Sequence, residues 1–428
     1  MKIENVKGGY NFLPNEQKIR NYINRTLITT FEEYGYKSIE TPILTYYDIL
    51  SGKYDENNDI LNEIYQLSDR GNRKLGLRYD LTVPFAKLIA LNKDNIKYPF
   101  KRYEIAKVFR DGPVKVGRDR EFTQCDVDVV GIDGQLIEAE LLSLYVIAFK
   151  KLNIEIIIKY NSRNLMTGLI LESGIDEDKI SKVITIIDKI NKLSISEIKE
   201  LLYEININND SIYKLLEYFN LSLDKLNKIF INTNNLVLKK GLEEINNLTK
   251  YIYELKIDKY TKFDISLARG QDYYTGNVFE VYEKNNKLTS SIGGGGRYDN
   301  MITEFIDDGN RYPAVGISFG LTSLYELLKN SNIDNNIDIY IIPINTYIDS
   351  LKLANEIRNM GYKVDIEMNN KKLKKSIEYA NKECIPYVII LGEDELKKGK
   401  FKFKNMSKGD EYLVDIDCIY NIKKYFDN

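Results

Sequence analysis

Residues 100–130 read FKRYEIAKVFRDGPVKVGRDREFTQCDVDVV, and this stretch decides the fold. Its two ends, FKRYEIAKVFR and EFTQCDVDVV, are rich in aromatic and β-branched residues and predict strands. The Gly and Pro residues between them indicate a loop, so we expect an antiparallel pair with a long basic connection. Alternate strand residues point the same way, so one face of the second strand carries Phe122, Gln124, Asp126 and Asp128. A solvent-facing strand would explain Gln and Asp equally well, but Phe122 suits a stacking site better.

The sequence before this pair predicts a helix and two short strands. Apolar residues recur at three- and four-residue steps from Pro14 to Tyr34, which is typical of a long amphipathic helix that ends at Gly35. Residues 36–40 form a strand candidate that Pro42 closes. Residues 77–82, LRYDLT, read as a further strand that carries Asp80 and Thr82. Asp80 could hold a substrate ammonium, although an isolated Asp on a strand is more often a structural residue.

The sequence after the pair divides into three parts. Residues 165–255 contain no Pro and show helical periodicity in pieces, so we expect an all-helical insertion. Residues 277–292 predict a hairpin, and AVGISFG, 314–320, predicts a strand that leads into a helix. Alternating strands and helices follow from residue 337, which indicates a small α/β domain with a largely parallel sheet. Residues 329–336 form the natural linker.

Composition limits the chemistry. The chain has 428 residues, 61 Lys and Arg, 63 Asp and Glu, 3 Cys and no His. Catalytic triads with His and His-ligated zinc are therefore excluded, and no metal site is predicted. The near-neutral charge argues against a uniformly basic surface for nucleic acid. Three distant Cys residues fit a reducing cytoplasm, and the lack of a long apolar run indicates no membrane span.

Three segments concentrate residues with chemical potential. The predicted loop after Arg110 carries Lys115, Arg118 and Arg120, cations that suit a polyanion or form a merely solvated loop. RGQDYYTG, 269–276, places Arg269 on a turn and Tyr273 and Tyr274 on opposite faces of the strand expected after it. GGGGRYD, 293–299, lets backbone approach a ligand closely. No Walker A or dinucleotide fingerprint is present, so a nucleotide would bind on an antiparallel sheet.

These segments together resemble the class II aminoacyl-tRNA synthetases, and specifically the histidyl-tRNA synthetase family. The resemblance covers nearly the whole chain. The first helix, strand and Pro42 are similar to motif 1, the Arg110 hairpin to motif 2, and AVGISFG with its helix to motif 3. RGQDYYTG and GGGGRYD are similar to the two blocks that distinguish this family, and the C-terminal α/β part resembles its anticodon-binding domain.

The resemblance implies roles for individual residues. Arg110 and Arg269 would be catalytic and would bind the substrate carboxylate and the α-phosphate of ATP. The ATP-binding set would add Phe122, which would stack on adenine, with Arg118 and Arg120 facing phosphates or the acceptor stem. The histidine-binding set would comprise Asp80, Leu81, Thr82, Gln124, Asp128, Tyr273 and Tyr274. Within this set, Asp80, Thr82 and Gln124 would hold the α-ammonium, and Asp128 and Tyr274 would read the imidazole.

The sequence also departs from the family pattern. The Glu-Arg pair that normally ends motif 3 is replaced by Thr322 and Ser323, and Gly112 replaces the Glu that usually follows the motif 2 Arg. Asp119 replaces an aromatic residue between the loop arginines, and Gln271 replaces a Leu. Losing one charge-assisted phosphate contact would cost about 1.5–3 kcal/mol. A regulatory subunit of ATP phosphoribosyltransferase or a plain RNA-binding module are therefore the competing hypotheses.

The predicted architecture has two domains. Residues 1–328 form an α+β catalytic domain with the antiparallel sheet of class II synthetases and the helical insertion, and residues 337–428 form the anticodon-binding α/β domain. The implied activity attaches L-histidine to tRNA(His) through an adenylate, with ATP and Mg²⁺ as substrate. The implied protein is a cytoplasmic homodimer without membrane contact. Lys371, Lys372, Lys374 and Lys375 could meet the anticodon stem or form a solvated helix face.

Overall fold

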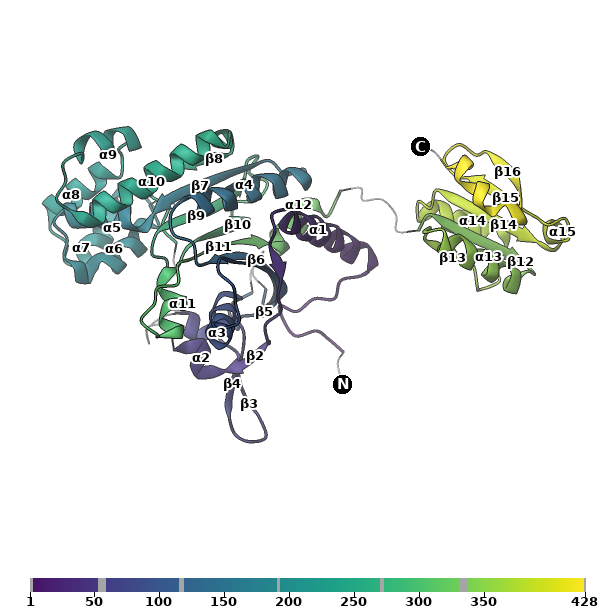
Figure 1. Ribbon diagram of the computed structural model, residues 1–428, viewed down its shortest axis with the longest axis horizontal. Coiled ribbons are helices and arrows are strands. Elements are labelled where there is room, and N and C mark those ends of the chain that lie inside the picture. The colour runs from purple at the N-terminus through teal and green to yellow at the C-terminus, as the bar shows by residue number, and fades with distance from the viewer. Residues whose placement is uncertain are drawn as a thin grey trace. The chain divides into compact units, whose positions relative to one another are not determined.

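The computed structural model divides the chain into two compact units, Met1–Ser331 and Asn332–Asn428 (Figure 1). It describes residues 3–52, 59–114, 119–190, 193–269, 273–331 and 337–426. Arg118, Lys115 and Gln271 lie outside the described residues. In the described part of the chain, no helix is both long enough and apolar enough to cross a membrane.

The first unit is built on an eight-stranded sheet with the order β1-β5-β6-β11-β10-β9-β7-β8. Its interior pairs are antiparallel, and only the pairings of β1 with β5 and of β7 with β8 are parallel among the described strands. The predicted antiparallel sheet is therefore confirmed. The strands are β1 (Lys37–Ser38), β5 (Phe100–Phe109), β6 (Glu121–Val130), β7 (Ile156–Ser162), β8 (Thr261–Phe263), β9 (Asn277–Glu283), β10 (Gly293–Arg297) and β11 (Ala314–Gly320).

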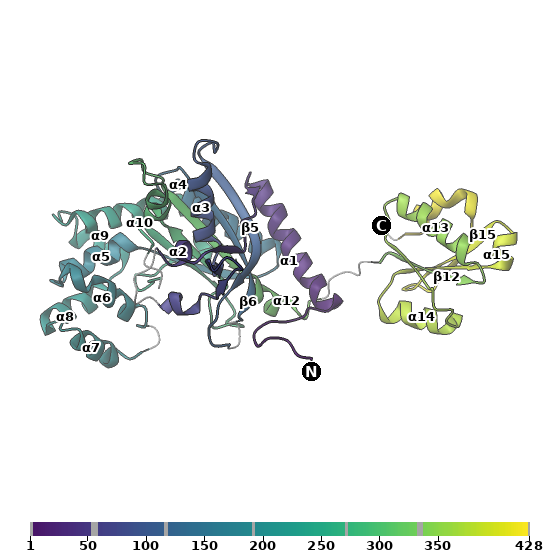
Figure 2. The ribbon, with the colours of Figure 1, turned by 90° about the horizontal axis from the view of Figure 1, so that it is seen from below.

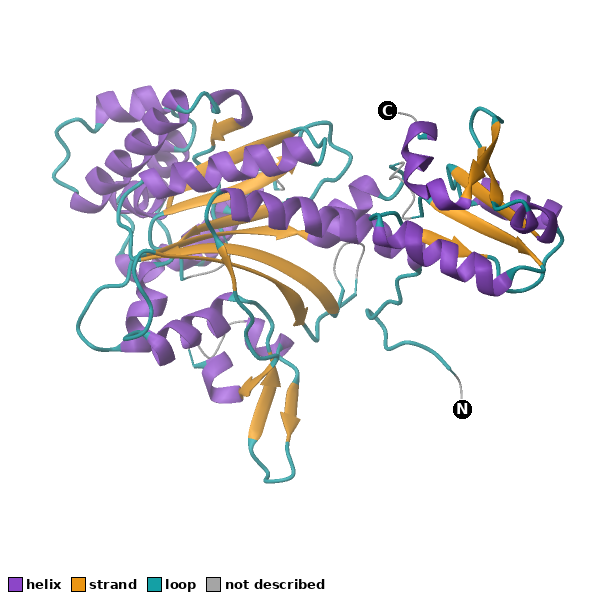
Figure 3. Cartoon of the chain, turned by 45° about the vertical axis from the view of Figure 1, so that its right-hand side comes forward, coloured by secondary structure: helices purple, strands orange, loops and turns teal. Residues whose placement is uncertain are grey.

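Helices and a small sheet cover the large sheet. Figure 3 shows long helices along one face and the smaller sheet, of order β2-β4-β3, projecting on the other side. Helix α1 packs on α4 and α12, and α3 packs on α11. The remaining elements outside the insertion are α1 (Pro14–Glu33), β2 (Leu44–Tyr46), α2 (Tyr47–Ser51), η1 (Asp59–Glu63), β3 (Gln66–Ser68), β4 (Lys74–Leu77), α3 (Thr82–Asn92), α4 (Leu136–Lys151), α11 (Asp299–Ile306) and α12 (Leu321–Leu328).

The expected insertion is helical and gathers at one end of the first unit (Figures 1 and 2). Its two inner helices, α5 and α10, cross at glycines: a β-carbon on Gly168 would lie 2.4 Å from Cα of Leu238, and one on Gly241 would lie 2.1 Å from the backbone nitrogen of Leu165. The close crossing therefore requires glycine at both positions. The elements are α5 (Arg163–Glu172), η2 (Glu177–Lys179), α6 (Ile180–Ile187), α7 (Ile195–Glu204), α8 (Asn209–Tyr218), α9 (Leu223–Ile229), α10 (Leu236–Glu254) and η3 (Asp258–Tyr260).

The second unit is an α/β domain with a five-stranded sheet of order β13-β12-β14-β15-β16. The first three strands are parallel, but β15 and β16 add antiparallel pairs, so the sheet is mixed rather than largely parallel. Its elements are β12 (Ile339–Ile344), α13 (Tyr347–Asn359), β13 (Val364–Ile366), α14 (Leu373–Lys382), β14 (Tyr387–Gly392), α15 (Glu393–Lys397), β15 (Lys400–Asn405), β16 (Glu411–Asp415) and η4 (Ile416–Tyr425).

Two local predictions were wrong. Asp80 and Thr82 do not lie on a strand, because β4 ends at Leu77 and α3 begins at Thr82. The Asp80 carboxylate instead accepts a hydrogen bond of 3.1 Å from the backbone N–H of Val83, in the first turn of α3. Tyr273 and Tyr274 precede β9 rather than alternating along it, and their rings lie 4.7 Å apart.

Candidate active site

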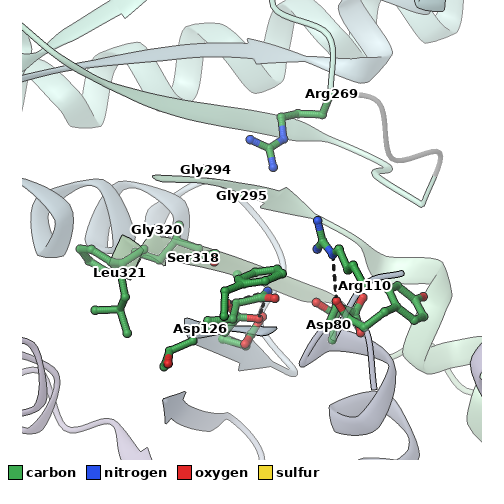
Figure 4. A pocket seen from close by; sticks show the side chains of 18 of the residues that line it. Asp80, Arg110, Asp126, Arg269, Gly294, Gly295, Ser318, Gly320 and Leu321 are labelled. Atoms are coloured by element: carbon green, nitrogen blue, oxygen red, sulfur yellow. Dashed lines mark hydrogen bonds between the residues drawn. The ribbon is translucent and has the colours of Figure 1, made fainter. Parts of the chain in front are cut away.

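A cavity of about 750 Å³ opens over the middle of the large sheet, where β6, β11 and β10 run side by side. The cavity brings together residues from separate segments of the sequence (Figure 4). Of the predicted site residues, those that line it are Asp80, Thr82, Arg110, Phe122, Gln124, Asp128, Arg269, Tyr273 and Tyr274.

Two guanidinium groups face this cavity from opposite sides, as Figure 4 shows for Arg110 and Arg269. Arg110 donates through Nε to the carbonyl of Tyr79 at 3.2 Å, and its Cζ lies 5.0 Å from the centre of the Phe122 ring. Arg269 pairs through Nη1 with Oε1 of Glu280 at 3.2 Å. Burial opposes the charge of Arg269, but Tyr274 and Glu280 outweigh this effect and raise its pKa, so the cation is permanent. Such a pair of fixed cations suits an anionic ligand between them.

The glycines of β10 make room for the side chains above them. A β-carbon on Gly294 would lie 2.0 Å from Nη1 of Arg269, and one on Gly296 would lie 2.7 Å from Cδ1 of Tyr274. Gly294 and Gly295 also line the cavity. The glycine run was predicted to admit a ligand, but at these two positions the space that it leaves is filled first by Arg269 and Tyr274.

The two acids on the polar face of β6 are buried rather than solvent-facing. Asp128 is 3% exposed and accepts a hydrogen bond of 2.5 Å from the hydroxyl of Tyr298. Its other oxygen lies 2.7 Å from Nη2 of Arg102, a fully buried cation on β5 whose Nη1 also lies 3.5 Å from Oε2 of Glu104. Burial raises the pKa of Asp128, and Arg102 opposes that shift.

Two other acids in the cavity are also buried. Burial raises the pKa of Asp80 to about 6, opposed by the hydrogen bond from Val83. Burial, and then the neighbouring charge of Asp128, raise the pKa of Asp126 to about 7. Asp126 is 4% exposed and accepts hydrogen bonds of 3.0 and 2.9 Å from Nε2 of Gln124. The floor of the cavity is therefore acidic, while Arg110 and Arg269 face it.

Two predicted site residues, Leu81 and Arg120, do not line the cavity. Leu81 is fully buried in the core, and its carbonyl accepts a hydrogen bond of 3.3 Å from Arg102. Arg120 does not line the cavity: its Nη2 pairs with Asp111 at 3.3 Å and its Nε donates to the carbonyl of Gly112 at 3.2 Å. Arg118 lies outside the described residues. The departures from the family pattern do reach the site, because Thr322, Ser323 and Asp119 line the cavity.

Two residues that line the cavity, Asp126 and Tyr298, and the buried Arg102 beneath Asp128 received no role from the sequence. Asp126 lies on the polar face of the second predicted strand, and Tyr298 lies in the GGGGRYD block, so a sequence pattern pointed to both residues. No sequence pattern pointed to Arg102, because an arginine in a strand is ordinarily exposed and nothing marks this one as buried. Its partner Asp128 lies on the neighbouring strand, directly across the ladder.

The loop that carries Tyr274 is tied to the helical insertion. Glu244 on α10 accepts hydrogen bonds of 2.6 Å from the hydroxyl of Ser162 and 2.8 Å from Nδ2 of Asn164. The same Asn164 amide donates to the carbonyl of Thr275 at 3.1 Å. A shift of α10 would therefore displace Asn164 and, through it, the backbone of Thr275 next to Tyr274.

The site provides fixed charges and hydrogen-bonding groups. In the parts of the chain that the structure describes, no group of three or more Asp, Glu or Cys side chains could hold a metal ion. Fixed guanidiniums and a set of buried acids can bind and align a zwitterionic ligand and a phosphate, which is the chemistry of charge stabilisation in a partly desolvated site.

Known proteins share this architecture over the whole chain. The sequence profile of the histidyl-tRNA synthetase family matches residues 8–324, and that of an anticodon-binding domain matches residues 338–422. Histidine–tRNA ligase 1 of Bacillus cereus strain ZK / E33L is 45% identical over 427 residues, which cover 98% of this chain and 100% of that protein. Histidine–tRNA ligase 2 of Shouchella clausii is 41% identical over 96% of this chain and 98% of that protein.

A solved structure agrees with these sequences. The crystal structure of histidyl-tRNA synthetase from Nostoc sp. PCC 7120 has a TM-score of 0.87 and 28% identity, and the match covers 100% of both chains. The profile matches include both the unit with the cavity and the unit with the five-stranded sheet. The chain therefore belongs to the histidyl-tRNA synthetase family.

Proposed function

We propose that this protein attaches L-histidine to tRNA(His), using ATP and a histidyl-adenylate intermediate. The observation that carries the proposal is the convergence of residues from both distinguishing blocks and from motifs 2 and 3 on one cavity, with Arg110 and Arg269 facing it from opposite sides. Relatives named histidine–tRNA ligase match this chain from end to end, which supports an enzyme of the same kind.

Adenylation requires little acid–base chemistry from the protein. The carboxylate of histidine attacks the α-phosphate of ATP, a P–O bond forms, and pyrophosphate leaves. Arg110 and Arg269 would align the carboxylate with the phosphate and neutralise the charge that develops between them. The raised pKa of Arg269 supports this role, because that guanidinium stays charged at every physiological pH. A terminal hydroxyl of the tRNA then attacks the adenylate carbonyl, and AMP leaves.

Recognition of the ring would use one acceptor and one donor. A neutral imidazole offers one N–H and one unprotonated nitrogen. Arg102 and the Tyr298 hydroxyl would hold Asp128 as the acceptor for the ring N–H. Burial raises the pKa of Tyr274, so its phenol remains a donor, with Tyr273 packed beside it. Unpaired buried polar groups would penalise an amino acid that lacks this pattern.

ATP would lie toward Phe122. The half-buried ring, with the Arg110 guanidinium over it, provides a stacking surface for adenine. Thr322 and Ser323 line the same cavity and supply hydroxyls where the family usually has a Glu and an Arg. Mg²⁺ would arrive with ATP as part of the substrate.

The second unit would bind the anticodon region of the tRNA. Its profile match supports this role, and its exposed lysines around the start of α14 could contact the phosphate backbone. These lysines are Lys371, Lys372, Lys374 and Lys375. We also infer a cytoplasmic homodimer formed through the motif 1 segment, in line with the family resemblance. Light scattering of the purified protein at micromolar concentration would test the dimer.

A regulatory subunit without catalysis is the competing function. The altered motif 3 favours it, since Ser323 cannot contact phosphate as an arginine does. Retention of Arg269, Tyr274 and Gln124 in one cavity, and of the second unit, favours the synthetase. The names of the relatives point the same way.

The deciding measurement is histidine-dependent exchange of labelled pyrophosphate into ATP. We expect exchange with the wild-type protein and a loss of at least a hundredfold with Arg269→Ala. Arg73→Ala is the matched control, because Arg73 is an exposed arginine that pairs with Asp69 on a hairpin of the small sheet. Wild-type protein that binds histidine but catalyses no exchange would overturn the proposed function in favour of the regulatory one.

A further inference from the structure

The three acids that face the cavity differ in their partners. Asp128 is engaged by the Tyr298 hydroxyl and by Arg102, at 2.5 and 2.7 Å. Asp80 accepts the backbone N–H of Val83 at 3.1 Å and so stabilises the first turn of α3. These two carboxylates are thus committed, at least in part, to holding the protein together.

Asp126 has a different environment. Both of its carboxylate oxygens accept from the same Gln124 amide group, at 3.0 and 2.9 Å, and Ser318, whose hydroxyl opposes the rise in the pKa of Asp126, lies opposite it across the β6–β11 ladder. These donors are neutral. In the described part of the chain no Lys or Arg nitrogen lies within 4.0 Å of Asp126, although the more distant charge of Arg102 acts on it. A buried carboxylate without a paired cation is costly to ionise, which is why its pKa is raised to about 7.

The side chain of Gln124, next to Asp126 on the same face of β6, has one atom without a hydrogen-bond partner. Oε1 of Gln124 is buried and accepts no hydrogen bond, although the amide nitrogen of the same side chain is fully used. A buried unpaired acceptor costs free energy unless a ligand supplies the donor. A carboxylate without a counter-ion and an acceptor without a donor therefore lie together on one face of β6, inside the cavity.

A cation with several N–H donors matches both groups. An ammonium has three donors and one positive charge, so it can satisfy the amide oxygen and the carboxylate together. We propose that Asp126, with Oε1 of Gln124, binds the α-ammonium of the amino-acid substrate and supplies its counter-charge. This assignment rests on the proposed function and adds a specificity-determining residue to the set that the family resemblance implies.

The strand geometry supports this placement. Alternate side chains on a strand are separated by roughly 6.7 Å, so Asp126 and Asp128 would meet different parts of one small ligand. With Asp128 on the ring, Asp126 falls toward the backbone end of the amino acid, next to Gln124. Asp80 and Thr82 approach from the start of α3 and would complete the ammonium site.

The test compares histidine with 3-(imidazol-4-yl)propionate, which keeps the ring and the carboxylate but lacks the ammonium. Binding of each ligand to the full-length protein would be measured by calorimetry at pH 8. We expect Asp126→Asn to weaken histidine binding about ten- to hundredfold. The affinity for imidazolylpropionate should change by less than about twofold, because this ligand has no group for Asp126 to bind.

Two further variants keep the test decisive. Gln124→Met removes Oε1 together with Nε2 at similar size and should also weaken histidine binding selectively, which tests the second member of the pair independently. Asp133→Asn, at an exposed acid, is the control and should change neither affinity. An equal loss for both ligands, or no loss for histidine, would overturn the assignment. Wild-type protein that binds no histidine would overturn it together with the proposed function, whereas binding without pyrophosphate exchange would overturn the proposed function alone.

Discussion

The carboxylate of Asp128 occupies the space above Gly316 on the neighbouring strand, where a β-carbon would lie 1.8 Å from Oδ1. The two residues face one another across the β6–β11 ladder. Any side chain at position 316 would therefore push Asp128 away from Tyr298 and Arg102.

We expect Gly316→Ala to weaken histidine binding at least tenfold and to lower the free energy of unfolding by about 1–3 kcal/mol, as overpacking of a well-packed site does. Calorimetry and urea unfolding would measure the two effects. Gly9→Ala is the matched control, because the nearest atom to its β-carbon would be a carbonyl oxygen at 3.4 Å. Unchanged histidine affinity in Gly316→Ala would show that the position of Asp128 does not matter for binding.

Restoring an arginine in motif 3 should improve the use of ATP. Ser323 lines the cavity, so Ser323→Arg would place a guanidinium near the bound nucleotide. One added charge-assisted contact is worth about 1.5–3 kcal/mol, and we expect the KM for ATP to fall roughly tenfold in pyrophosphate exchange. The KM for histidine should stay the same. A higher KM for ATP would mean that other residues already fill the place of the arginine.

The link between the insertion and the Tyr274 loop can be tested at Glu244. In Glu244→Gln the amide oxygen can still accept from Asn164, but the amide NH₂ would face the Ser162 hydroxyl, which already accepts the backbone N–H of Leu165, and both bonds lose the carboxylate charge. We expect the free energy of unfolding to fall by about 1–3 kcal/mol. The rate of exchange should fall as well, because Asn164 also holds the carbonyl of Thr275. The neighbouring exposed residue provides the control, Glu243→Gln, which should behave as wild type.

The buried acid Asp126 should make stability depend on pH. Its pKa is raised from 3.8 to about 7, so between these values the folded protein keeps a proton that the unfolded chain has released. The free energy of unfolding therefore falls as the pH rises through this window. The amide that Asp126→Asn introduces cannot ionise, so this variant should be more stable than wild type at pH 8, and the difference should shrink toward pH 5. Urea unfolding without ligand at several pH values measures this slope, and equal slopes in both proteins would contradict the shift.

Much of the fold follows from local sequence patterns. The aromatic and β-branched residues of 100–110 and 121–130 predict β5 and β6, and the helical periodicity before Gly35 predicts α1, which buries one face. Strand β15 was missed although Phe401 and Phe403 alternate with lysines in KFKFKN, so the signal was present. The start of α3 was misread because LRYDLT has an alternation that also fits a strand.

The site was harder to predict than the fold. Asp80, Gln124, Arg110 and Arg269 were predicted because the motifs mark them, and the structure brings them to one cavity. The buried pair of Arg102 and Asp128 depends on the register of two strands, which no local pattern encodes. The environment of Asp126 likewise depends on Ser318 across the β6–β11 ladder.

If the proposed assignment of Asp126 and Asp128 holds, the alternating side chains of β6 select the ligand by length. Gln124, Asp126 and Asp128 are fixed on one pleated strand in the middle of a wide sheet, so the spacing between them cannot adapt to the ligand. With the ammonium at Asp126 and the ring at Asp128, the fixed distance between these two side chains would set the distance between the ammonium and the ring of an accepted amino acid. An amino acid with one more methylene between its ammonium and its ring would fill the cavity equally well yet leave one end unbound. Selection by length would thus come from the backbone itself, and loops around the cavity could change without relaxing it.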